Sequence, residues 1–333
     1  VGASSGQGTV NIIGNFTSGG HFGDLSASGA SDLEQINISK GNTFTLSAGH
    51  NASATRMNIN GTVTAQGSAN ITSAVTMGDG SVLNLTNTGT GGGSTAARVA
   101  GAIDGYAGAT GTLNVNGTWS TAGVIGATRA IAAINLDSDN DTASHTYTFA
   151  HNVNATTITL GTNDAQSSNT TLAISAAITV TGDIVSSGNA SIAGILDINE
   201  NTIFVDNIGT SSAAIERITV ITGKTATFKD SIYAGNITLE TAGTASTSAA
   251  FAFNGTANTA YTVTGKIDGQ EFGHGSITVN TGNVTFSNAI GSNMYLNTIT
   301  VLDNAEMATT KNISANGTIS VVGTLDINDA VTI

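Results

Sequence analysis

The chain contains the stretch Ile215-Glu216-Arg217-Ile218-Thr219-Val220-Ile221-Thr222-Gly223, in which an apolar residue and two spacers precede an alternation of apolar and polar residues. The same pattern runs from Leu33 to Gly41, and it returns from Leu296 to Asn304 with asparagine in the place of glycine. Alternation with a period of two predicts a half-buried strand. Glycine and asparagine both tolerate a positive φ, so each copy predicts a strand that ends in a tight corner.

A second strand follows the corner in two of these copies. Asn42-Thr43-Phe44-Thr45-Leu46 comes after the first copy, and Lys224-Thr225-Ala226-Thr227-Phe228 comes after the second. One strand–corner–strand unit is therefore reused along the chain. A further repeat, Gly194-Ile195-Leu196-Asp197-Ile198-Asn199, returns as Gly323-Thr324-Leu325-Asp326-Ile327-Asn328. Turns of about 20 residues, which lie in the range of solenoid repeats, would place whole numbers of turns between the copies.

The composition favours extensive backbone pairing over a large globular core. The 333 residues include no proline and no cysteine, 9% of them are charged and 5% are aromatic. Proline removes a ladder donor and is excluded from central strands, so its absence fits a chain whose strands and corners are paired nearly throughout. Hydrophobic residues make up 39% of the chain. They are mostly Ala, Val, Ile and Leu, which suit a narrow core of small and branched aliphatic side chains.

These features predict an all-β chain that folds as a parallel β-helix, or β-solenoid, with irregular loops. In such a fold each strand pairs with the equivalent strand of the next turn, about 4.8 Å away. The four Asn-Gly-Thr sequences that begin at Asn60, Asn116, Asn254 and Asn316 suit its corners. Tandem antiparallel β-sandwich modules are the alternative, because Asn-Gly also favours hairpin turns. We expect one continuous solenoid over residues 1–333, with a loop-rich break near 87–111 that includes a short helix at Ala96-Ala97-Arg98-Val99-Ala100.

Charge and hydropathy exclude several classes of function. The formal net charge is −13, which argues against nucleic-acid binding and against electrostatic docking to anionic lipid. No run of 18 apolar residues occurs in the sequence, so no transmembrane segment is predicted. Enzymes that cleave polysaccharides gather paired carboxylates on one face, and β-helical lyases also need basic residues there. The 9 Lys and Arg residues are mostly isolated, so we expect no enzymatic activity.

One acidic loop has the spacing of a metal site. Asp137, Asp139 and Asp141 alternate along Asp137-Ser138-Asp139-Asn140-Asp141, and alternating carboxylates in a loop are suitable ligands for calcium. The loop lacks the glycine and the bidentate glutamate that complete an EF-hand. A solvated acidic turn is therefore the competing interpretation, and calcium is the one cofactor that the sequence suggests.

Several short sequence segments resemble those of a known family of surface proteins. Ile215–Val220, Tyr261–Gly269, Gly182–Ile184 and Ala315–Ile319 are similar to the passenger repeats of rickettsial outer-membrane protein B and of related alphaproteobacterial surface-antigen autotransporters. The resemblance implies a surface-exposed passenger that forms a surface layer or acts as an adhesin. The translocator barrel that ends such proteins is not among these residues.

We therefore expect a non-enzymatic structural protein of the bacterial cell surface, outside the cell. Its partners would be copies of itself, because uncapped solenoid edges pair readily into a layer or a filament. The alternative is an adhesin stalk that displays loops such as 87–111 to a host cell or a glycan, with the outer membrane or a host surface as its partner. Recognition surfaces are usually enriched in Tyr, Trp and Arg, so the composition favours the structural role.

Overall fold

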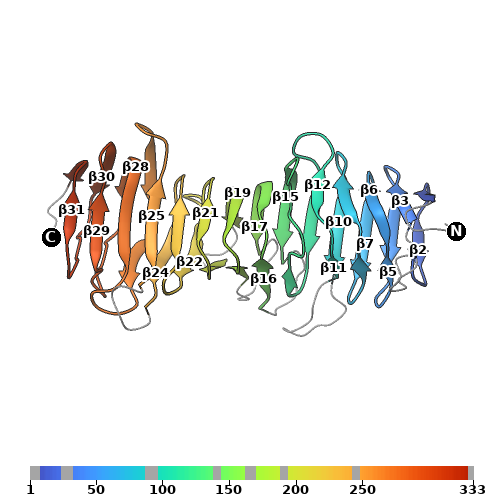
Figure 1. Ribbon diagram of the computed structural model, residues 1–333, viewed down its shortest axis with the longest axis horizontal. Coiled ribbons are helices and arrows are strands. Elements are labelled where there is room, and N and C mark those ends of the chain that lie inside the picture. Colours follow the sequence, from blue (N-terminus) through green and yellow to red (C-terminus); the bar gives the residue numbers. More distant parts are fainter. Residues whose placement is uncertain are drawn as a thin grey trace. The chain divides into compact units, whose positions relative to one another are not determined.

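The computed structural model describes residues 8–23, 33–86, 97–137, 144–161, 170–187, 194–241 and 248–328. All regular structure in these ranges is β-strand, and the strands stack in parallel as a β-solenoid of about 11 turns (Figure 1). The predicted parallel β-helix is thereby confirmed. The antiparallel sandwich alternative is wrong, because the pairings that join the strands are parallel. The chain divides into two compact units, Val1–Thr170 and Thr171–Ile333, which are described in turn.

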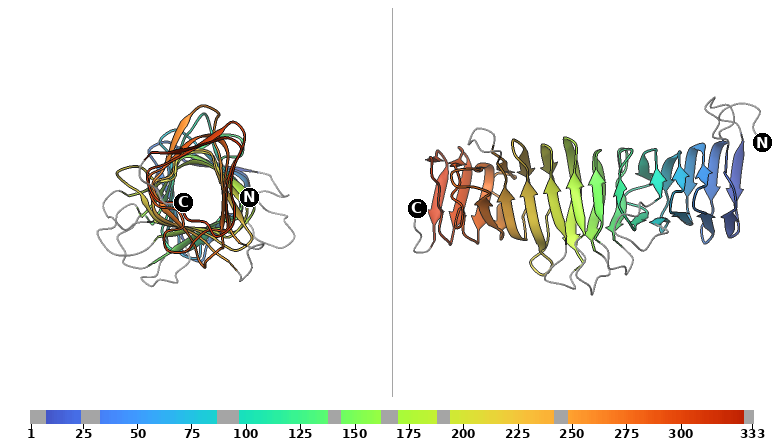
Figure 2. Two further views of the ribbon diagram at one scale, coloured as in Figure 1. Left: turned by 90° about the vertical axis from the view of Figure 1, so that its left-hand side faces the viewer. Right: turned by 90° about the horizontal axis from the view of Figure 1, so that it is seen from below.

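Unit 1 is built from parallel ladders, whose strands lie side by side in Figures 1 and 2. The first ladder contains β1 (Thr9–Ile12), β3 (Leu33–Ile38), β6 (Ala54–Ile59), β9 (Ala74–Met77) and β12 (Ile103–Gly105). The second contains β2 (Phe16–Ser18), β4 (Thr43–Leu46), β7 (Thr62–Gln66), β10 (Val82–Thr86), β13 (Thr112–Val115), β15 (Ile131–Leu136) and β17 (Val153–Leu160). A short third ladder contains β5 (Asn51–Ala52), β8 (Asn70–Ile71) and β11 (Arg98–Val99). A different sheet contains β14 (Trp119–Ser120), which pairs with β16 (Thr146–Phe149).

Unit 2 repeats this arrangement. One ladder contains β18 (Thr171–Ile174), β20 (Ile195–Ile198), β22 (Ile215–Val220), β24 (Ala234–Leu239) and β27 (Lys266–Gly269). Another contains β19 (Ile178–Ser186), β21 (Thr202–Phe204), β23 (Thr225–Phe228), β25 (Ala250–Asn254), β28 (Ser276–Phe286), β29 (Thr298–Val301) and β31 (Ile319–Val321). The second half of β28 pairs instead within the ladder of β26 (Ala260–Val263), β30 (Ala305–Thr309) and β32 (Thr324–Ile327).

Alternation along the strands places every second side chain in the core. Along β19, buried residues alternate with half-buried residues from one end to the other. The core contains many Ile, Leu and Val side chains, as expected, but it also contains a stack of phenylalanine rings. Phe204 and Phe228 have ring centroids 5.3 Å apart, and Phe228 and Phe251 have centroids 4.9 Å apart, both in stacked geometry. The expectation of a core of small and branched aliphatic side chains is therefore incomplete, and unit 1 also buries the rings of Phe44, Tyr147 and Phe149.

The turns differ in length. Asn84 hydrogen-bonds Thr64 across a turn of 20 residues, and Asn114 hydrogen-bonds Asn84 across a turn of 30 residues. The repeated stretches are therefore not separated by whole turns. In unit 2, β22 lies in the ladder of β20, β24 and β27, whereas β29 pairs with β28 and β31. The prediction that whole turns of about 20 residues separate the copies is therefore wrong for β22 and β29. It is also wrong for β20 and β32, which belong to different ladders.

The segment expected to hold a short helix is extended where it is described. Arg98–Val99 is strand β11, which pairs in parallel with Asn70–Ile71 of β8. The helix prediction is wrong for these residues, because backbone pairing with the turn before overrides the local helix propensity of the alanines. Within the described ranges, the structure holds no helix with the length and apolar character needed to cross a membrane.

Candidate functional site

Asp137 is the one residue of the predicted calcium loop that lies in the described part of the chain. It follows strand β15 in a left-handed conformation, with φ of 63°, and its side chain is buried. Its N–H donates to the carbonyl of Val115, and its Oδ2 accepts a hydrogen bond of 2.6 Å from Thr170 Oγ1. Asp139 and Asp141 lie outside the described residues. The calcium site therefore stays a prediction, with one of its three carboxylates placed in a buried corner.

Among the described residues, no group of three or more histidines or carboxylates is arranged to hold a metal ion.

The arrangement of described residues that most resembles a catalytic triad surrounds His274 in unit 2. Its Nδ1 lies 2.8 Å from Thr241 Oγ1 and 3.2 Å from Ser248 Oγ, while its Nε2 is 4.0 Å from a carboxylate oxygen of Glu271. A catalytic triad needs a carboxylate hydrogen-bonded to the ring, and 4.0 Å is beyond that distance. The arrangement ties together two segments of unit 2 without forming a triad.

Unit 1 contains a cleft of about 650 Å³ at a break between ladders. The ladder β5–β8–β11 ends at β11, and β14 belongs to a different sheet, in which it pairs with β16. No β-pairing therefore joins β11 to β14 in the part of the chain that the structure describes. Where the two turns separate, space opens between Arg98 on one wall and Trp119 on the other.

The walls of the cleft come from registered strands. Asn51, Asn70 and Arg98 are paired across β5, β8 and β11, so their side chains form a column on one wall. Trp119, Ser120 and Thr121 form the opposite wall. Trp119 and Thr121 are buried whereas Ser120 is exposed. The lining therefore combines residues at core positions with residues at outward positions.

Two buried polar atoms of the cleft have no hydrogen-bond partner within the described residues. They are the indole Nε1 of Trp119, whose side chain is 6% exposed, and the carboxamide Oδ1 of Asn70. Nearly all buried polar groups in proteins are hydrogen-bonded. Neither atom has accessible surface, so a ligand in the cleft would not reach them, and the cleft is a candidate binding site by its volume alone.

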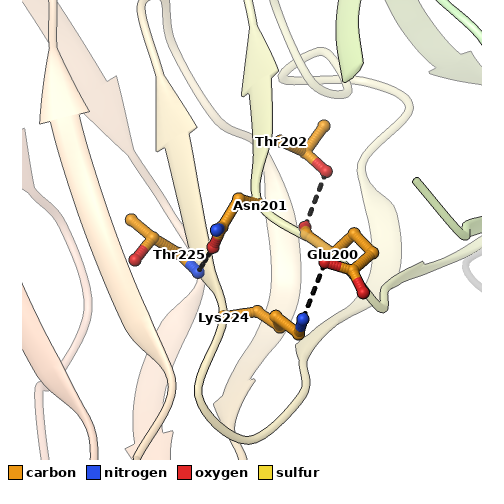
Figure 3. A network of polar contacts seen from close by, with 5 residues as sticks. All are labelled: Glu200, Asn201, Thr202, Lys224 and Thr225. Atoms are coloured by element: carbon orange, nitrogen blue, oxygen red, sulfur yellow. Dashed lines mark hydrogen bonds and ion pairs between the residues drawn. The ribbon is translucent and has the colours of Figure 1, made fainter. Parts of the chain in front are cut away.

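Unit 2 carries a polar network at a corner between successive turns (Figure 3). Lys224 Nζ lies 2.7 Å from Glu200 Oε2, and Asn201 Oδ1 accepts a hydrogen bond of 2.8 Å from the N–H of Thr225. Thr202 Oγ1 donates to the carbonyl of Glu200 at 2.8 Å. The ion pair is about one third exposed at each end, so its stabilisation is at most about 1 kcal/mol. The network joins one turn to the next and needs no ligand.

The same unit presents an exposed aromatic pair. Phe272 is 60% exposed and Tyr295 is 44% exposed, and their ring centroids lie 5.4 Å apart in an edge-to-face arrangement. The N–H of Gly273 donates to the carbonyl of Tyr295, which holds the two segments together. The pair is a small apolar patch on the described surface of unit 2.

The cleft of unit 1 was not predicted from the sequence. The one available signal is that Trp119 is the single tryptophan of the chain. Its position in a strand of alternating residues indicates an inward side chain, but nothing in the sequence shows that β11 and β14 fail to pair.

Comparison of the chain with protein-family models, with curated proteins and with solved structures gives no match.

Proposed function

We propose that the chain is a structural protein of the bacterial cell surface, whose copies associate through the open edges of their β-solenoid ladders. The surface location rests on the resemblance of Ile215–Val220 and Tyr261–Gly269 to surface-antigen passengers. The association rests on one structural observation, which is the apolar character of the outermost described turns.

The outermost turn of unit 2 exposes side chains that a further turn would bury. Among the described strands, β31 pairs with β29 alone and β32 pairs with β30 alone. Val321 is 41% exposed and Ile327 is 42% exposed. Their register partners one turn earlier, Val301 and Thr309, are fully buried. The unpaired strand edge and its apolar side chains together favour the addition of another strand pair.

The first described turn of unit 1 has the same character. Strand β1 pairs with β3 and strand β2 pairs with β4, and no earlier strand is described. Phe16 is 42% exposed, whereas its register partner Phe44 is fully buried. When the first turn of one copy stacks on the last turn of another, the two contacting surfaces differ, and the contact is heterologous. Heterologous contacts produce a filament unless the copies close into a ring. We therefore favour a second copy of this chain as the occupant of each edge.

The experiment is sedimentation velocity and negative-stain electron microscopy of the wild-type chain over a range of concentrations, beside the variants Val321→Lys on β31 and Phe16→Lys on β2. Ile203→Lys is the matched control, because Ile203 is 38% exposed on β21 within unit 2. The wild type and the Ile203 variant are expected to assemble into fibres or sheets. The two edge variants are expected to stay monomeric, because a lysine on an edge strand blocks pairing.

Two results would contradict the proposal. One is a wild-type chain that is monomeric at every concentration, which would favour the adhesin alternative. The other is an Ile203 variant that disrupts assembly as strongly as the edge variants, which would place the contact on the side of the solenoid.

A further inference from the structure

Two columns of residues run side by side where the strands of the first ladder of unit 1 end. The register of β3, β6 and β9 aligns the outward residues Asn37, Asn58 and Thr76 in one column. The residues that directly follow the strands form the other column, in which each N–H donates to the carbonyl that ends the strand of the turn before; they are Ser39, Asn60, Gly78 and Tyr106. A groove of about 340 Å³ is lined by both columns, and we call it the Tyr106 groove.

The glycine at position 78 opens this groove. Gly78 stands between Asn60 and Tyr106 in its column, where any other residue would place a side chain. Its φ is not positive, so the backbone does not require a glycine there. An added Cβ would instead clash with Asn60 Oδ1, because the Asn60 side chain lies over Gly78. The groove therefore has a carboxamide at one end and the ring of Tyr106 on the turn beyond the glycine.

Tyr106 presents its ring to solvent from a fixed backbone. Its side chain is 71% exposed, the largest exposure of any phenylalanine, tyrosine or tryptophan in the described ranges. Its N–H donates to the carbonyl of Met77 at 2.8 Å and to Thr110 Oγ1 at 3.1 Å, and Thr110 Oγ1 in turn donates to Met77. The ring offers a flat apolar face and a phenolic hydroxyl. Because its backbone is already held in place, little ordering of the backbone is needed when a ligand binds.

The polar groups of the groove are accessible and only partly used. Asn58 Nδ2 donates to Asn37 Oδ1, but Asn58 Oδ1 accepts no hydrogen bond from the described residues and keeps accessible surface. In the second ladder, the same oxygen of Asn114 accepts from an asparagine of the next turn, whereas the next turn here holds Thr76. The side chains of Thr76 and Asn60 also form no hydrogen bond within the described ranges. A ligand can therefore use an amide oxygen, a hydroxyl and a complete carboxamide.

The lining of the groove is uncharged, although the chain has a formal net charge of −13. Asp104 follows Thr76 in the register, and Asp79 follows Gly78 along the chain. These carboxylates flank the groove and disfavour an anionic ligand. An apolar peptide would need a mainly apolar lining, whereas Tyr106 supplies the one exposed apolar side chain among the lining residues. A ligand with several hydroxyl groups, one apolar face and no negative charge fits this lining best.

We propose that the Tyr106 groove binds a neutral saccharide. One sugar ring stacks its C–H face on Tyr106, and the sugar hydroxyls hydrogen-bond to Asn58 Oδ1, Thr76 Oγ1 and the Asn60 carboxamide. The volume of about 340 Å³ lies at the lower end of the range for ligand sites, so about one or two sugar rings occupy it. The proposal does not depend on the association of copies proposed above, because the groove lies over strands that are paired on both sides.

Isothermal titration calorimetry of the wild-type chain tests the binding. The neutral probes are cellotetraose, laminaritetraose, mannotetraose and tetra-N-acetylchitotetraose, and tetragalacturonate is an anionic probe of the same length. At least one neutral probe is expected to bind with a Kd below about 1 mM, as a small and open site allows. Tetragalacturonate is expected to bind at least about tenfold more weakly, because Asp79 and Asp104 repel its carboxylates.

Variants identify the residues that carry the binding. Tyr106→Ala is expected to weaken it by about tenfold or more, whereas Tyr106→Phe keeps the ring and should stay within about threefold of the wild type. Tyr295→Ala is the matched control, because Tyr295 is an exposed tyrosine of unit 2. Asn60→Ala should weaken binding by about fivefold, because the ligand loses a hydrogen bond. Thermal unfolding of each variant checks that it folds.

The proposal fails if none of the four neutral probes binds below about 1 mM, or if tetragalacturonate binds as tightly as the best of them. It also fails if Tyr106→Ala binds like Tyr295→Ala. A Tyr106→Phe variant that loses binding as fully as Tyr106→Ala would overturn the stacking, because the hydroxyl and not the ring would then carry the interaction. Sedimentation of the same samples reports association of copies separately, so failure of one proposal is distinguishable from failure of the other.

Discussion

Gly41 and Asn304 adopt the same left-handed backbone conformation at the corner that follows a repeated strand, with φ of 78° at Gly41 and 63° at Asn304. Gly223 occupies the corner of the remaining copy with φ of 71°. Within unit 2 the two copies turn between different ladders, since the corner at Gly223 leads from β22 to β23 and the corner at Asn304 leads from β29 to β30. The shared sequence pattern therefore specifies a kind of corner, and it does not specify a position in the solenoid.

Replacement of these corner residues by alanine is expected to destabilise the chain. At Gly41 an added Cβ would meet no atom within 4 Å, so the change measures backbone strain alone. Gly41→Ala and Asn304→Ala should each lower the free energy of unfolding by about 1–2 kcal/mol, because a left-handed conformation is unfavourable for residues with a Cβ. Asn304→Gly should be close to neutral.

Gly14→Ala is the control for steric effects. Gly14 also has open space around its Cα and does not have a positive φ. Urea unfolding followed by circular dichroism measures the midpoint of each variant. A Gly41→Ala midpoint equal to that of Gly14→Ala would contradict the assignment of strain to the corner.

Phe228 is expected to be the most sensitive position of the aromatic stack. Its ring lies between Phe204 and Phe251, and its side chain is 1% exposed. Phe228→Ala should destabilise unit 2 by about 3–5 kcal/mol, since it removes a buried ring and leaves a cavity. Phe272→Ala, at a ring that is 60% exposed, should change the unfolding midpoint little. Equal effects of the two substitutions would show that burial in the stack does not determine stability.

Asn114 is expected to stabilise three turns at once. Its Nδ2 donates to Asn84 Oδ1 at 2.8 Å, and its Oδ1 accepts from Asn135 Nδ2 at 2.8 Å. Asn114→Ala should cost about 1–3 kcal/mol, because two half-buried amides lose their partners. Asn11→Ala is the graded control, since Asn11 lies on β1, at the end of the first ladder, and accepts one exposed hydrogen bond from Asn37. Chemical unfolding should show the smaller effect for Asn11, and the reverse order would contradict this account.

Calcium is expected to raise the melting temperature if the loop that begins at Asp137 binds it, because a ligand that binds only the folded chain stabilises it. Asp139→Asn and Asp141→Asn should abolish the increase and leave the melting temperature in EDTA unchanged. Thr170→Val should lower the melting temperature in EDTA, because Thr170 donates a hydrogen bond to the buried carboxylate of Asp137. If calcium does not change the melting temperature of the wild type, the calcium prediction is wrong and the solvated acidic turn is the correct interpretation.

The class of the fold was predictable because it depends on short-range features. Alternation along stretches such as Ile215–Val220 identifies inward and outward residues, and the residues at Gly41, Gly223 and Asn304 identify the corners. The lack of proline leaves every residue with a backbone N–H that can donate to a ladder. The Phe204–Phe228–Phe251 stack was missed because a low aromatic content does not reveal which rings meet in the core. Phe204 and Phe228 are register partners, whereas Phe251 is in register with Ala226.

The sequence by itself determined the repeated strands and corners, because each depends on residues within one strand–corner–strand unit, and its composition favoured parallel stacking over antiparallel modules. Only the tertiary structure decided which ladder each strand joins and where pairing fails. Those features depend on contacts between residues 20 to 30 positions apart, such as Thr64 with Asn84 and Asn84 with Asn114. Loops of unequal length change that spacing from turn to turn. The cleft between Arg98 and Trp119 follows from one such change, and so it has no signature in the local pattern of residues.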